Sequence, residues 1–339
     1  MYKIYNRRYT GSKTKLIDWI FEIINKNCNG KSFVDIFSGT GVVSYYASKN
    51  GYEDITLNDL LYSSVVIYNA FFGSEEIDIL KLEKIIVELE DLSKLAKPNY
   101  FSKNFGGKYF EEENARRIGY IRQSIQLQKN INNREKDVLI ASLVYSMDKL
   151  ANTVGHYDAF FKNMKNTRQF EYKMIDIENF DSKFNIFRED ANKLIKNISG
   201  DILYIDPPYN SRQYNRFYHV IENLVEWKKP KLFGTALKPK DNSNSSEYCK
   251  VKAPEVFANL IENSNFKYIV VSYNNTYNSK SKSSKNKITL EQIEETLNKK
   301  GSTKIYTKNH PHFNAGNTDF DNHMELLFVT KVGEKFEDN

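Results

Sequence analysis

The chain has 339 residues, of which 40% are hydrophobic and 14% are aromatic, and its formal net charge is +6. This length and composition suit one large domain or two modest ones and exclude a wholly disordered protein. The two cysteines, Cys28 and Cys249, are too few for a disulfide framework or an all-cysteine metal site. The start of the chain does not resemble a signal peptide, and no apolar run reaches the roughly 18 residues of a membrane span. We therefore expect a soluble, cytoplasmic protein.

Residues 1–75 predict alternating helices and strands. Apolar residues recur at helical spacing from Lys15 to Ile24. The short apolar run Ser32–Phe37 predicts a strand, and the Ser-Gly-Thr-Gly sequence at 38–41 predicts a tight loop after it. The elements expected next are a helix over Val42–Lys49, a strand over Asp54–Leu57 and a helix over Leu60–Phe72.

From residue 76 the sequence changes to helical periodicity, which is clearest near Ile77–Leu95 and Val138–Leu150. Between these two segments, Pro98–Gly107 predicts an irregular stretch. We expect an inserted, mainly helical region with a task of its own, surrounded by a single domain that is split in the sequence. The predicted boundaries are 76–183 for the insertion, and 1–75 with 184–339 for the domain.

The last part of the chain returns to alternating strands and helices. Strand-like runs lie at Phe184–Phe187, Asp201–Ile205, Tyr268–Tyr273, Lys304–Thr307 and Glu325–Thr330. Helical patterns lie at Arg216–Trp227, Pro254–Ile261 and Leu290–Leu297, and a polar hairpin is expected over His310–Asn322. Strands that alternate with helices usually pair in parallel. The sequence therefore predicts an α/β fold with a mostly parallel, seven-stranded sheet and helices on both faces.

A strand that runs into a glycine-rich turn is the first candidate site. In Val34–Gly41, Gly39 and Gly41 allow the backbone to approach a ligand closely, because glycine has no side chain. Asp59 follows the next predicted strand, where its carboxylate can accept hydrogen bonds from ribose hydroxyls. The pattern lacks the third glycine of a dinucleotide-binding turn and the lysine of a phosphate-binding loop. By itself, it leaves open a purely structural turn.

The second candidate site is Asp-Pro-Pro-Tyr at 206–209, directly after the apolar strand Asp201–Ile205. Ligands bind at the carboxyl ends of the strands in open α/β sheets. Pro207 and Pro208 fix the backbone and lack N–H donors, which leaves hydrogen-bond acceptors beside the flat ring of Tyr209. Acceptors next to an aromatic face suit an exocyclic amine on a planar ring, although an isolated Asp-Pro-Pro is often only a turn.

Together these motifs resemble the amino-methyltransferases that use S-adenosylmethionine, in particular the D12 class (the Dam-like alpha group) of adenine-specific DNA methyltransferases. In that class a motif similar to Tyr9-Thr-Gly-Ser-Lys13 comes first, followed by the glycine loop, a long insertion and Asp-Pro-Pro-Tyr, which is the order here. Asn152–His156 and Asn210–Tyr214 further resemble the subset that includes type IIS modification methylases. One departure is Asp35-Ile-Phe37, where some relatives have Glu-Pro-Phe, but the acidic charge is retained.

The resemblance implies S-adenosylmethionine as the cofactor and gives roles to single residues. Asp35 is expected to bind the methionine amino group, Asp59 the ribose, and Asp190 the adenine amine of the cofactor. The other expected cofactor-binding residues are Tyr9, Lys13, Phe37, Gly39, Gly41 and Asp206.

The resemblance also implies that the target adenine leaves the helix stack and enters the pocket, which costs a few kcal/mol. Tyr209 is expected to stack on the flipped base, an interaction worth roughly 1–3 kcal/mol. Asp206 and the carbonyl of Pro207 are expected to accept hydrogen bonds from the N6 amine, and Pro208 completes the catalytic tetrapeptide. The methylated amine loses its proton readily, so no dedicated base is expected. In this class the insertion carries target recognition.

Three segments of the chain are rich in basic residues: 1–15, 228–252 and 278–287. On one shared face they would attract the phosphates of DNA, whereas each alone could be a solvated loop. The candidate DNA contacts are His156, Arg212, Arg216, Lys280, Lys282, Lys285 and Lys287. A structural role remains open for the histidine, and a surface ion pair for each arginine. No metal is expected, because His310, His312 and His323 lack a completing ligand.

The sequence thus predicts a site-specific adenine methyltransferase that acts on double-stranded DNA, with a cognate restriction endonuclease as its functional partner in a restriction–modification system. An enzyme that methylates RNA or another exocyclic amine remains an alternative. A catalytically silent DNA-binding subunit is the other alternative, and it is disfavoured because Asp35, Asp59, Asp206 and Tyr209 are all present.

Overall fold

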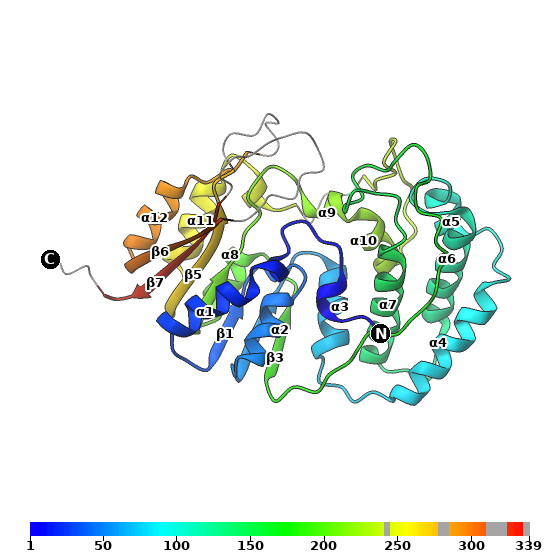
Figure 1. The fold of residues 1–339 in the computed structure, drawn as a ribbon, viewed down its shortest axis with the longest axis horizontal. Helices are drawn as coiled ribbons and strands as arrows, with labels where there is room; N and C mark the ends of the chain where they lie inside the picture. Colours follow the sequence, from blue (N-terminus) through cyan, green and yellow to red (C-terminus); the bar gives the residue numbers. More distant parts are fainter. Residues whose placement is uncertain (241–244, 277–284, 310–323, 335–339) are drawn as a thin grey trace. The chain divides into compact units, whose positions relative to one another are not determined.

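The computed structural model of the chain describes residues 1–240, 245–276, 285–309 and 324–334 (Figure 1). The chain divides into two compact units. The sheet unit comprises Lys13–Leu60, Asp181–Gln213 and Asn244–Asn339. The helical unit comprises Met1–Ser12, Leu61–Phe180 and Tyr214–Ser243.

Within its described residues the sheet unit holds a seven-stranded sheet with the strand order β3-β2-β1-β4-β5-β7-β6. The strands are β1 (Ser32–Asp35), β2 (Asp54–Asn58), β3 (Lys183–Phe187), β4 (Gly200–Ile205), β5 (Phe266–Asn274), β6 (Gly301–Asn309) and β7 (Met324–Val332). The pairings from β3 to β5 are parallel, whereas β7 runs antiparallel to both β5 and β6. The seven strands are confirmed, but the sheet is mixed, so the prediction of a mostly parallel sheet is wrong.

The antiparallel edge follows from the order of the last two strands. β6 and β7 are consecutive in the chain and pair along their whole length, with Asn309 opposite Met324. Consecutive strands that pair directly run antiparallel, because a parallel pair needs a crossover connection. The hairpin segment expected over 310–322 lies outside the described residues.

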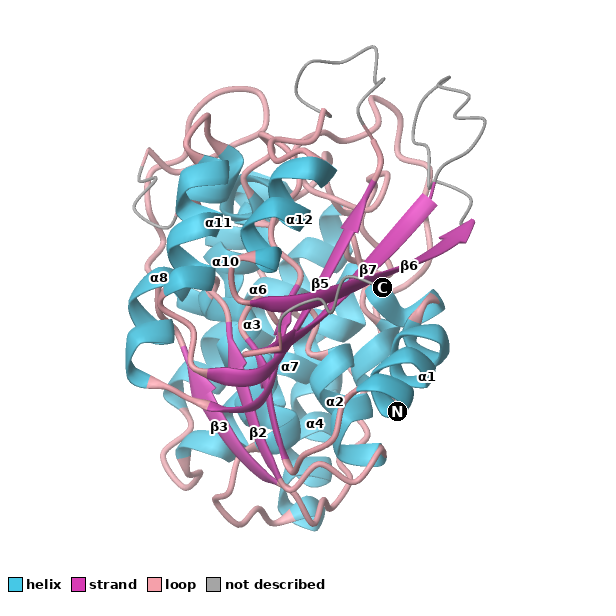
Figure 2. Ribbon diagram, turned by 90° about the vertical axis from the view of Figure 1, so that its left-hand side faces the viewer, coloured by secondary structure: helices cyan, strands magenta, loops and turns pink. Residues whose placement is uncertain are grey.

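Helices cover both faces of the sheet (Figure 2). On one face lie α1 (Ile17–Asn27) and α2 (Val42–Lys49), and on the other lie α8 (Ala191–Leu194), α11 (Ala253–Glu262) and α12 (Leu290–Asn298). Side chains alternate between the faces along a strand. In β1 the ring of Phe33 lies 5.9 Å from that of Phe21 on α1, whereas Val34 joins a buried cluster with Phe257 of α11. The short helices of this unit are η2 (Lys13–Lys15), η3 (Ile195–Asn197) and η4 (Glu247–Cys249).

The helices of the helical unit between residues 61 and 180 are α3 (Tyr62–Phe72), α4 (Ile79–Ser93), α5 (Tyr100–Phe105), α6 (Glu112–Leu127) and α7 (Asn133–Asp148). The other parts of this unit contribute η1 (Ile4–Asn6), α9 (Tyr214–Phe217) and α10 (His219–Glu226). The irregular stretch predicted over Pro98–Gly107 is wrong, because the side chain of Asn99 caps α5 by accepting from the N–H groups of Phe101 and Ser102. The sequence pattern did not predict α6, whose buried face includes the charged residues Arg117 and Arg122.

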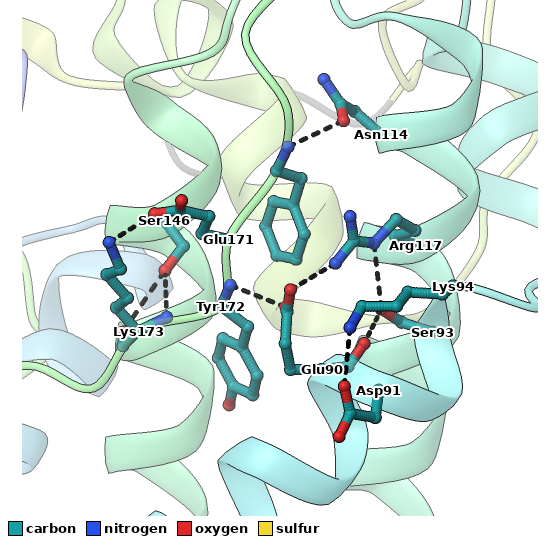
Figure 3. A network of polar contacts seen from close by, with 11 residues as sticks. Glu90, Asp91, Ser93, Lys94, Asn114, Arg117, Ser146, Glu171, Tyr172 and Lys173 are labelled. Atoms are coloured by element: carbon teal, nitrogen blue, oxygen red, sulfur yellow. Dashed lines mark hydrogen bonds and ion pairs between the residues drawn. The ribbon is translucent and has the colours of Figure 1, made fainter.

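Polar contacts hold the irregular segment before residue 180 against the helices of this unit (Figure 3). Glu90 of α4 accepts hydrogen bonds from the N–H of Tyr172, at 2.8 Å, and from the guanidinium of Arg117 on α6. Asn114 of α6 accepts from the N–H of Phe170 at 2.9 Å. These bonds satisfy main-chain groups that no regular element pairs, and thereby order the segment without a helix or strand.

The two cysteines are free and buried. Burial raises the pKa of both Cys28 and Cys249 to about 12, so neither thiol is a ready nucleophile near neutral pH. Among the helices of the described residues, none has the length and apolar character needed to cross a membrane.

Candidate active site

The Asp-Pro-Pro-Tyr sequence follows β4, at the carboxyl end of that strand. β4 is buried over Ile202–Ile205 and lies between β1 and β5. The strand order reverses here, because β2 and β3 extend the sheet on the side of β1, and β5 extends it on the other. Open α/β sheets bind their ligands at such a switch point, outside the carboxyl ends of the strands. A ligand-binding site is therefore expected at the loops after β1 and β4.

Asp206 accepts two hydrogen bonds through the same carboxylate oxygen. The hydroxyl of Tyr209 donates to Oδ1 at 2.5 Å, and the ammonium of Lys13 on η2 donates to it at 3.0 Å. Lys13 also donates to the Tyr209 hydroxyl at 2.9 Å, which closes a triangle of three side chains. Burial raises the pKa of Asp206, and both Lys13 and Tyr209 oppose that rise.

Tyr209 is fixed by contacts to its ring and to its main chain. Its ring centroid lies 4.4 Å from that of Tyr273 on β5, and the hydroxyl of Tyr273 donates to the Tyr209 carbonyl at 3.4 Å. The N–H of Lys287 donates to the same carbonyl at 2.8 Å. The sequence did not indicate Tyr273 as a site residue, because a tyrosine within an apolar strand gives no sign of a long-range partner.

The glycine loop after β1 is fixed by hydrogen bonds that its residues donate. Gly39 and Gly41 have φ angles of 53° and 78°, which residues other than glycine rarely adopt. The hydroxyl of Ser38 donates to the carbonyl of Asp35 at 2.6 Å. The N–H of Gly39 donates to the carboxylate of Asp59 at 3.0 Å, which joins the loop after β1 to the loop after β2.

Asp35 carries a buried carboxylate oxygen without a hydrogen-bond partner. The side chain is 1% exposed. Oδ2 accepts from the hydroxyl of Ser44 at 3.0 Å, while Oδ1 has no hydrogen-bond partner among the residues that the structure describes. Burial raises the pKa of Asp35 to about 8, and the nearby carboxylates of Asp206 and Asp59 add to that rise. An unsatisfied buried acceptor is costly unless a ligand completes it. A cationic donor such as an ammonium group fits this position.

Asn58 is a structural member of the site that the sequence analysis missed. Its side-chain amide donates to the carbonyls of Ile36 and Glu189, at 3.1 and 3.0 Å, and its side-chain oxygen accepts from the N–H of Glu189 at 2.9 Å. It thereby ties the loop after β1 to the loop after β3. The available signal was a polar residue directly after the strand predicted over Asp54–Leu57.

Replacing Asn58 with alanine is expected to destabilise the protein by about 2–4 kcal/mol, because three main-chain groups lose their partner in a buried place. Urea unfolding followed by circular dichroism measures this change. Asn25→Ala is the matched control, since Asn25 is exposed and its amide bonds the side chain of Asn50; it should cost less than about 0.5 kcal/mol. Equal losses in the two variants would contradict the bridging role.

Phe37 and Asp190 lie in the loops after β1 and β3. Phe37 packs edge-on against Tyr248, with ring centroids 4.9 Å apart. Asp190 caps α8 by accepting from the N–H of Asn192 at 3.0 Å. The loops after β1, β2, β3 and β4 thus carry Phe37, Asp59, Asp190 and Asp206 at one edge of a single sheet.

Comparison with known proteins identifies the family. Residues 9–288 match the sequence profile of the D12 class N6 adenine-specific DNA methyltransferases. The chain belongs to this family. The predicted resemblance is therefore confirmed, and the protein is an adenine-specific DNA methyltransferase.

Three relatives give the extent of the similarity. The Type II methyltransferase M.NlaIII of Neisseria lactamica is 32% identical, over 93% of this chain and 95% of its own length. The Type II methyltransferase M.CviAII of Paramecium bursaria Chlorella virus 1 is 31% identical, over 95% of this chain and 97% of its own length. The Type II methyltransferase M.FokI of Planomicrobium okeanokoites is 34% identical over 88% of this chain but only 48% of its own length, so this chain spans about half of that relative.

Three of the predicted site residues of this D12 methyltransferase belong to the helical unit. Tyr9 stacks on Tyr218 of α10, with ring centroids 4.6 Å apart and an interplanar angle of 7°. His156 stacks on Phe217 of α9, with ring centroids 4.4 Å apart, and its Nδ1 accepts from the N–H of Asp158. Arg216 is exposed on α9.

The other predicted DNA contacts of the methyltransferase lie in the sheet unit. Arg212 is half-buried, its N–H donates to the side chain of Asn210, and its carbonyl accepts from the thiol of Cys249. Lys285 is exposed and Lys287 is half-buried. Lys280 and Lys282 lie outside the described residues, as do His310, His312 and His323. Among the described residues, no group of three His, Cys, Asp or Glu side chains could hold a metal ion.

Proposed function

We propose that this methyltransferase transfers a methyl group from S-adenosylmethionine to the N6 amine of a flipped adenine at a specific sequence in duplex DNA. The observation that carries the proposal is the unpartnered oxygen of Asp35, one strand away from the Asp206–Tyr209 tetrapeptide on the same edge of the sheet. A buried carboxylate that lacks a donor suits the ammonium group of the methionine moiety.

The residues of the sheet unit fit the other parts of the cofactor. Gly39 and Gly41 leave room for the ligand beside the backbone, and Asp59 is a carboxylate suited to ribose hydroxyls. The remaining residues of the sheet unit assigned to the cofactor are Lys13, Phe37, Asp190 and Asp206, whereas Tyr9, expected from the sequence to bind the cofactor, belongs to the helical unit. S-adenosylmethionine supplies a methyl group on a positively charged sulfur.

The tetrapeptide suits the target base. Asp206 and the carbonyl of Pro207 accept hydrogen bonds from the N6 amine, which concentrates its lone pair on the side that faces the methyl group. Tyr209 stacks on the flipped base and offsets part of the cost of unstacking it. Pro207 and Pro208 keep these groups in place, so the rate comes from positioning and electrostatics. The methylated amine loses its proton to solvent without a dedicated base.

We assign target recognition to the mainly helical insertion at 76–183, which is set into a catalytic domain of residues 1–75 and 184–339. His156, Arg212 and Arg216 are proposed contacts to DNA. The Type II names of the relatives support a role in a restriction–modification system, with a cognate endonuclease as functional partner. The DNA substrate supports a location in the cytoplasm of a bacterium, with the nucleoid.

Transfer of tritiated methyl groups from S-adenosylmethionine to duplex DNA tests the proposal. We expect labelled N6-methyladenine in one sequence context, which sequencing of modified bases in DNA from expressing cells will identify. Label in RNA instead of DNA would favour an RNA methyltransferase. Cofactor binding without transfer to any nucleic acid would favour a silent subunit.

Removing four lysines from the segment 278–287 is expected to weaken binding to specific and unrelated DNA alike. The variant combines Lys280→Ala, Lys282→Ala, Lys285→Ala and Lys287→Ala. Each lysine that neutralises a phosphate contributes about 0.9 to the slope of log affinity against log salt, so the slope should flatten by up to about 3.6. Fluorescence anisotropy at several salt concentrations measures it, and sequence preference should survive.

The control for the lysine variant keeps the same change in net charge. It removes exposed lysines at Lys26, Lys49, Lys196 and Lys299, which lie near the ends of helices or short turns of the sheet unit. Its salt slope should match that of the unaltered protein. If the slope of the 278–287 variant is also unchanged, this segment does not touch DNA.

A further inference from the structure

Lys13 and Tyr209 hold one end of the Asp206 carboxylate. Both of their donors meet Oδ1, at 3.0 and 2.5 Å. Among the described residues, both recorded side-chain contacts of this carboxylate end on Oδ1, and no hydrogen bond to Oδ2 is recorded. The carboxylate therefore has one end that is anchored by the protein and another that is left for a donor from a ligand.

Asp206 lies among other acidic and phenolic groups. Those that influence its charge or the charge of its partner Lys13 come from three strands and one loop of the sheet unit: Asp35 of β1, Tyr204 of β4, Glu325 of β7, and Tyr209 of the loop after β4. The hydroxyl of Ser272 on β5 lies near the hydroxyl of Tyr209. Lys13 is the cation in ion-pair contact with Asp206, and its side chain is only 5% exposed.

Burial and neighbouring carboxylates both favour a protonated, neutral Asp206. The pKa of Asp206 is raised by burial first, and Glu325 adds to that rise, while Lys13 opposes it. In return the carboxylates of Asp206 and Glu325 raise the pKa of Lys13, against the effect of its burial. Lys13 thus remains charged where it contacts Asp206. If a neutral side chain replaced Lys13, the groups around Asp206 would be carboxyls and phenols, which favour its protonated form.

We propose that Lys13 is a positioning residue that keeps Asp206 ionised and anchored through Oδ1, so that Oδ2 remains free to accept the hydrogen bond from the N6 amine of the target adenine. This inference rests on the proposed function of Asp206 and extends it. It gives Lys13 a role in the chemical step, in addition to its expected place along the cofactor. A protonated Asp206 would lose its charge, and with it much of its pull on the amine.

The pH dependence of methyl transfer distinguishes this role from a purely structural one. Lys13→Met removes the charge but keeps the length of the side chain. With both substrates saturating, kcat is measured from about pH 6 to about pH 9. At neutral pH we expect a loss of about tenfold or more. Because the pKa of Asp206 rises when Lys13 is neutralised, the ratio of variant to unaltered kcat should climb as pH increases, by up to tenfold per unit.

Matched variants complete the experiment. Lys13→Arg keeps the charge and should restore the pH profile, although its different shape can lower the rate. Lys26→Met is the control, because Lys26 is exposed on α1 and lies outside the three basic segments, and it should leave both rate and profile unchanged. Lys13→Gln replaces Lys13→Met if the latter does not fold. A ratio that stays constant across the pH range would overturn the proposal.

A direct titration separates this inference from the proposed function. Carbon-13 NMR of protein labelled in its aspartate carboxyls, assigned with Asp206→Asn, reports the ionisation of Asp206 without DNA or cofactor. The midpoint should lie higher in Lys13→Met than in the unaltered protein. Equal midpoints would overturn the role of Lys13 even in an active enzyme. Absence of transfer to DNA by the unaltered protein would instead overturn the proposed function.

Discussion

The Asp206→Ala enzyme is expected to transfer methyl groups at least a hundredfold more slowly than the unaltered protein, a loss of about 2.7 kcal/mol in transition-state stabilisation. The substitution removes the acceptor for the N6 amine and leaves Lys13 without its ion-pair partner. DNA binding should be largely kept, because phosphate contacts elsewhere supply most of the affinity. Single-turnover transfer of tritiated methyl groups to duplex DNA measures the rate.

Two controls test whether the slower transfer comes from the loss of the Asp206 carboxylate or from a disturbed fold. Asp18→Ala removes an exposed aspartate from α1 and should leave the rate unchanged. Circular dichroism of Asp206→Ala should show an unaltered fold. Transfer by Asp206→Ala at more than about a tenth of the normal rate, which corresponds to a barrier change of about 1.4 kcal/mol, would remove Asp206 from the mechanism.

The second large effect is expected at Asp35. Asp35→Ala should weaken S-adenosylmethionine binding by about tenfold to a hundredfold, since a charge-assisted hydrogen bond is worth about 1.5–3 kcal/mol. Isothermal titration calorimetry measures the affinity. Affinity for DNA in the same variant serves as the internal control and should hardly change. Unaltered cofactor affinity would mean that the loop after β1 has another role.

The release of protons on cofactor binding gives a second test of the role of Asp35. Burial raises the pKa of Asp35 to about 8, so we expect this carboxyl to be largely protonated near neutral pH in the free protein. An ammonium ligand favours the ionised form and lowers this pKa, so binding below about pH 8 must release a proton. Affinity should therefore rise with pH until the amino group of the ligand itself loses its proton, near about pH 8. Calorimetry in buffers of different ionisation enthalpy counts the protons, and Asp35→Ala should release none.

Local sequence predicted the parts of the site that depend on neighbouring residues. Gly39 and Gly41 indicate a turn because few other residues adopt their φ angles. The apolar run before Asp206 indicates a buried strand, and the strand's carboxyl end then places that aspartate at the edge of the sheet. The seven strands of the described sheet and several helices were predicted in this way, since hydrophobic periodicity is itself a local property.

Contacts between distant residues account for what the sequence left out. The Lys13 ammonium reaches the Tyr209 hydroxyl, and Glu325 joins the same cluster from β7, yet no spacing in the sequence relates these residues. α6 went unnoticed because Arg117 and Arg122 lie on its buried face, where they bond Glu90 and the carbonyls of Leu224 and Val225. From sequence alone a charged side chain is expected to lie at the surface, because a buried partner for it cannot be recognised.

The position of β7 also bears on how the chain folds as it is synthesised. It is the last of the described strands to be made, yet it lies inside the sheet, between β5 and β6. Until β7 emerges, β6 has no strand to pair with, and the edge of β5 is open to other chains. β7 also brings Glu325 beside the charges of Lys13 and Asp206. β6 and β7 are therefore the last strands of the described sheet to pair, and the group of charges around Asp206 is complete only once β7 is in place.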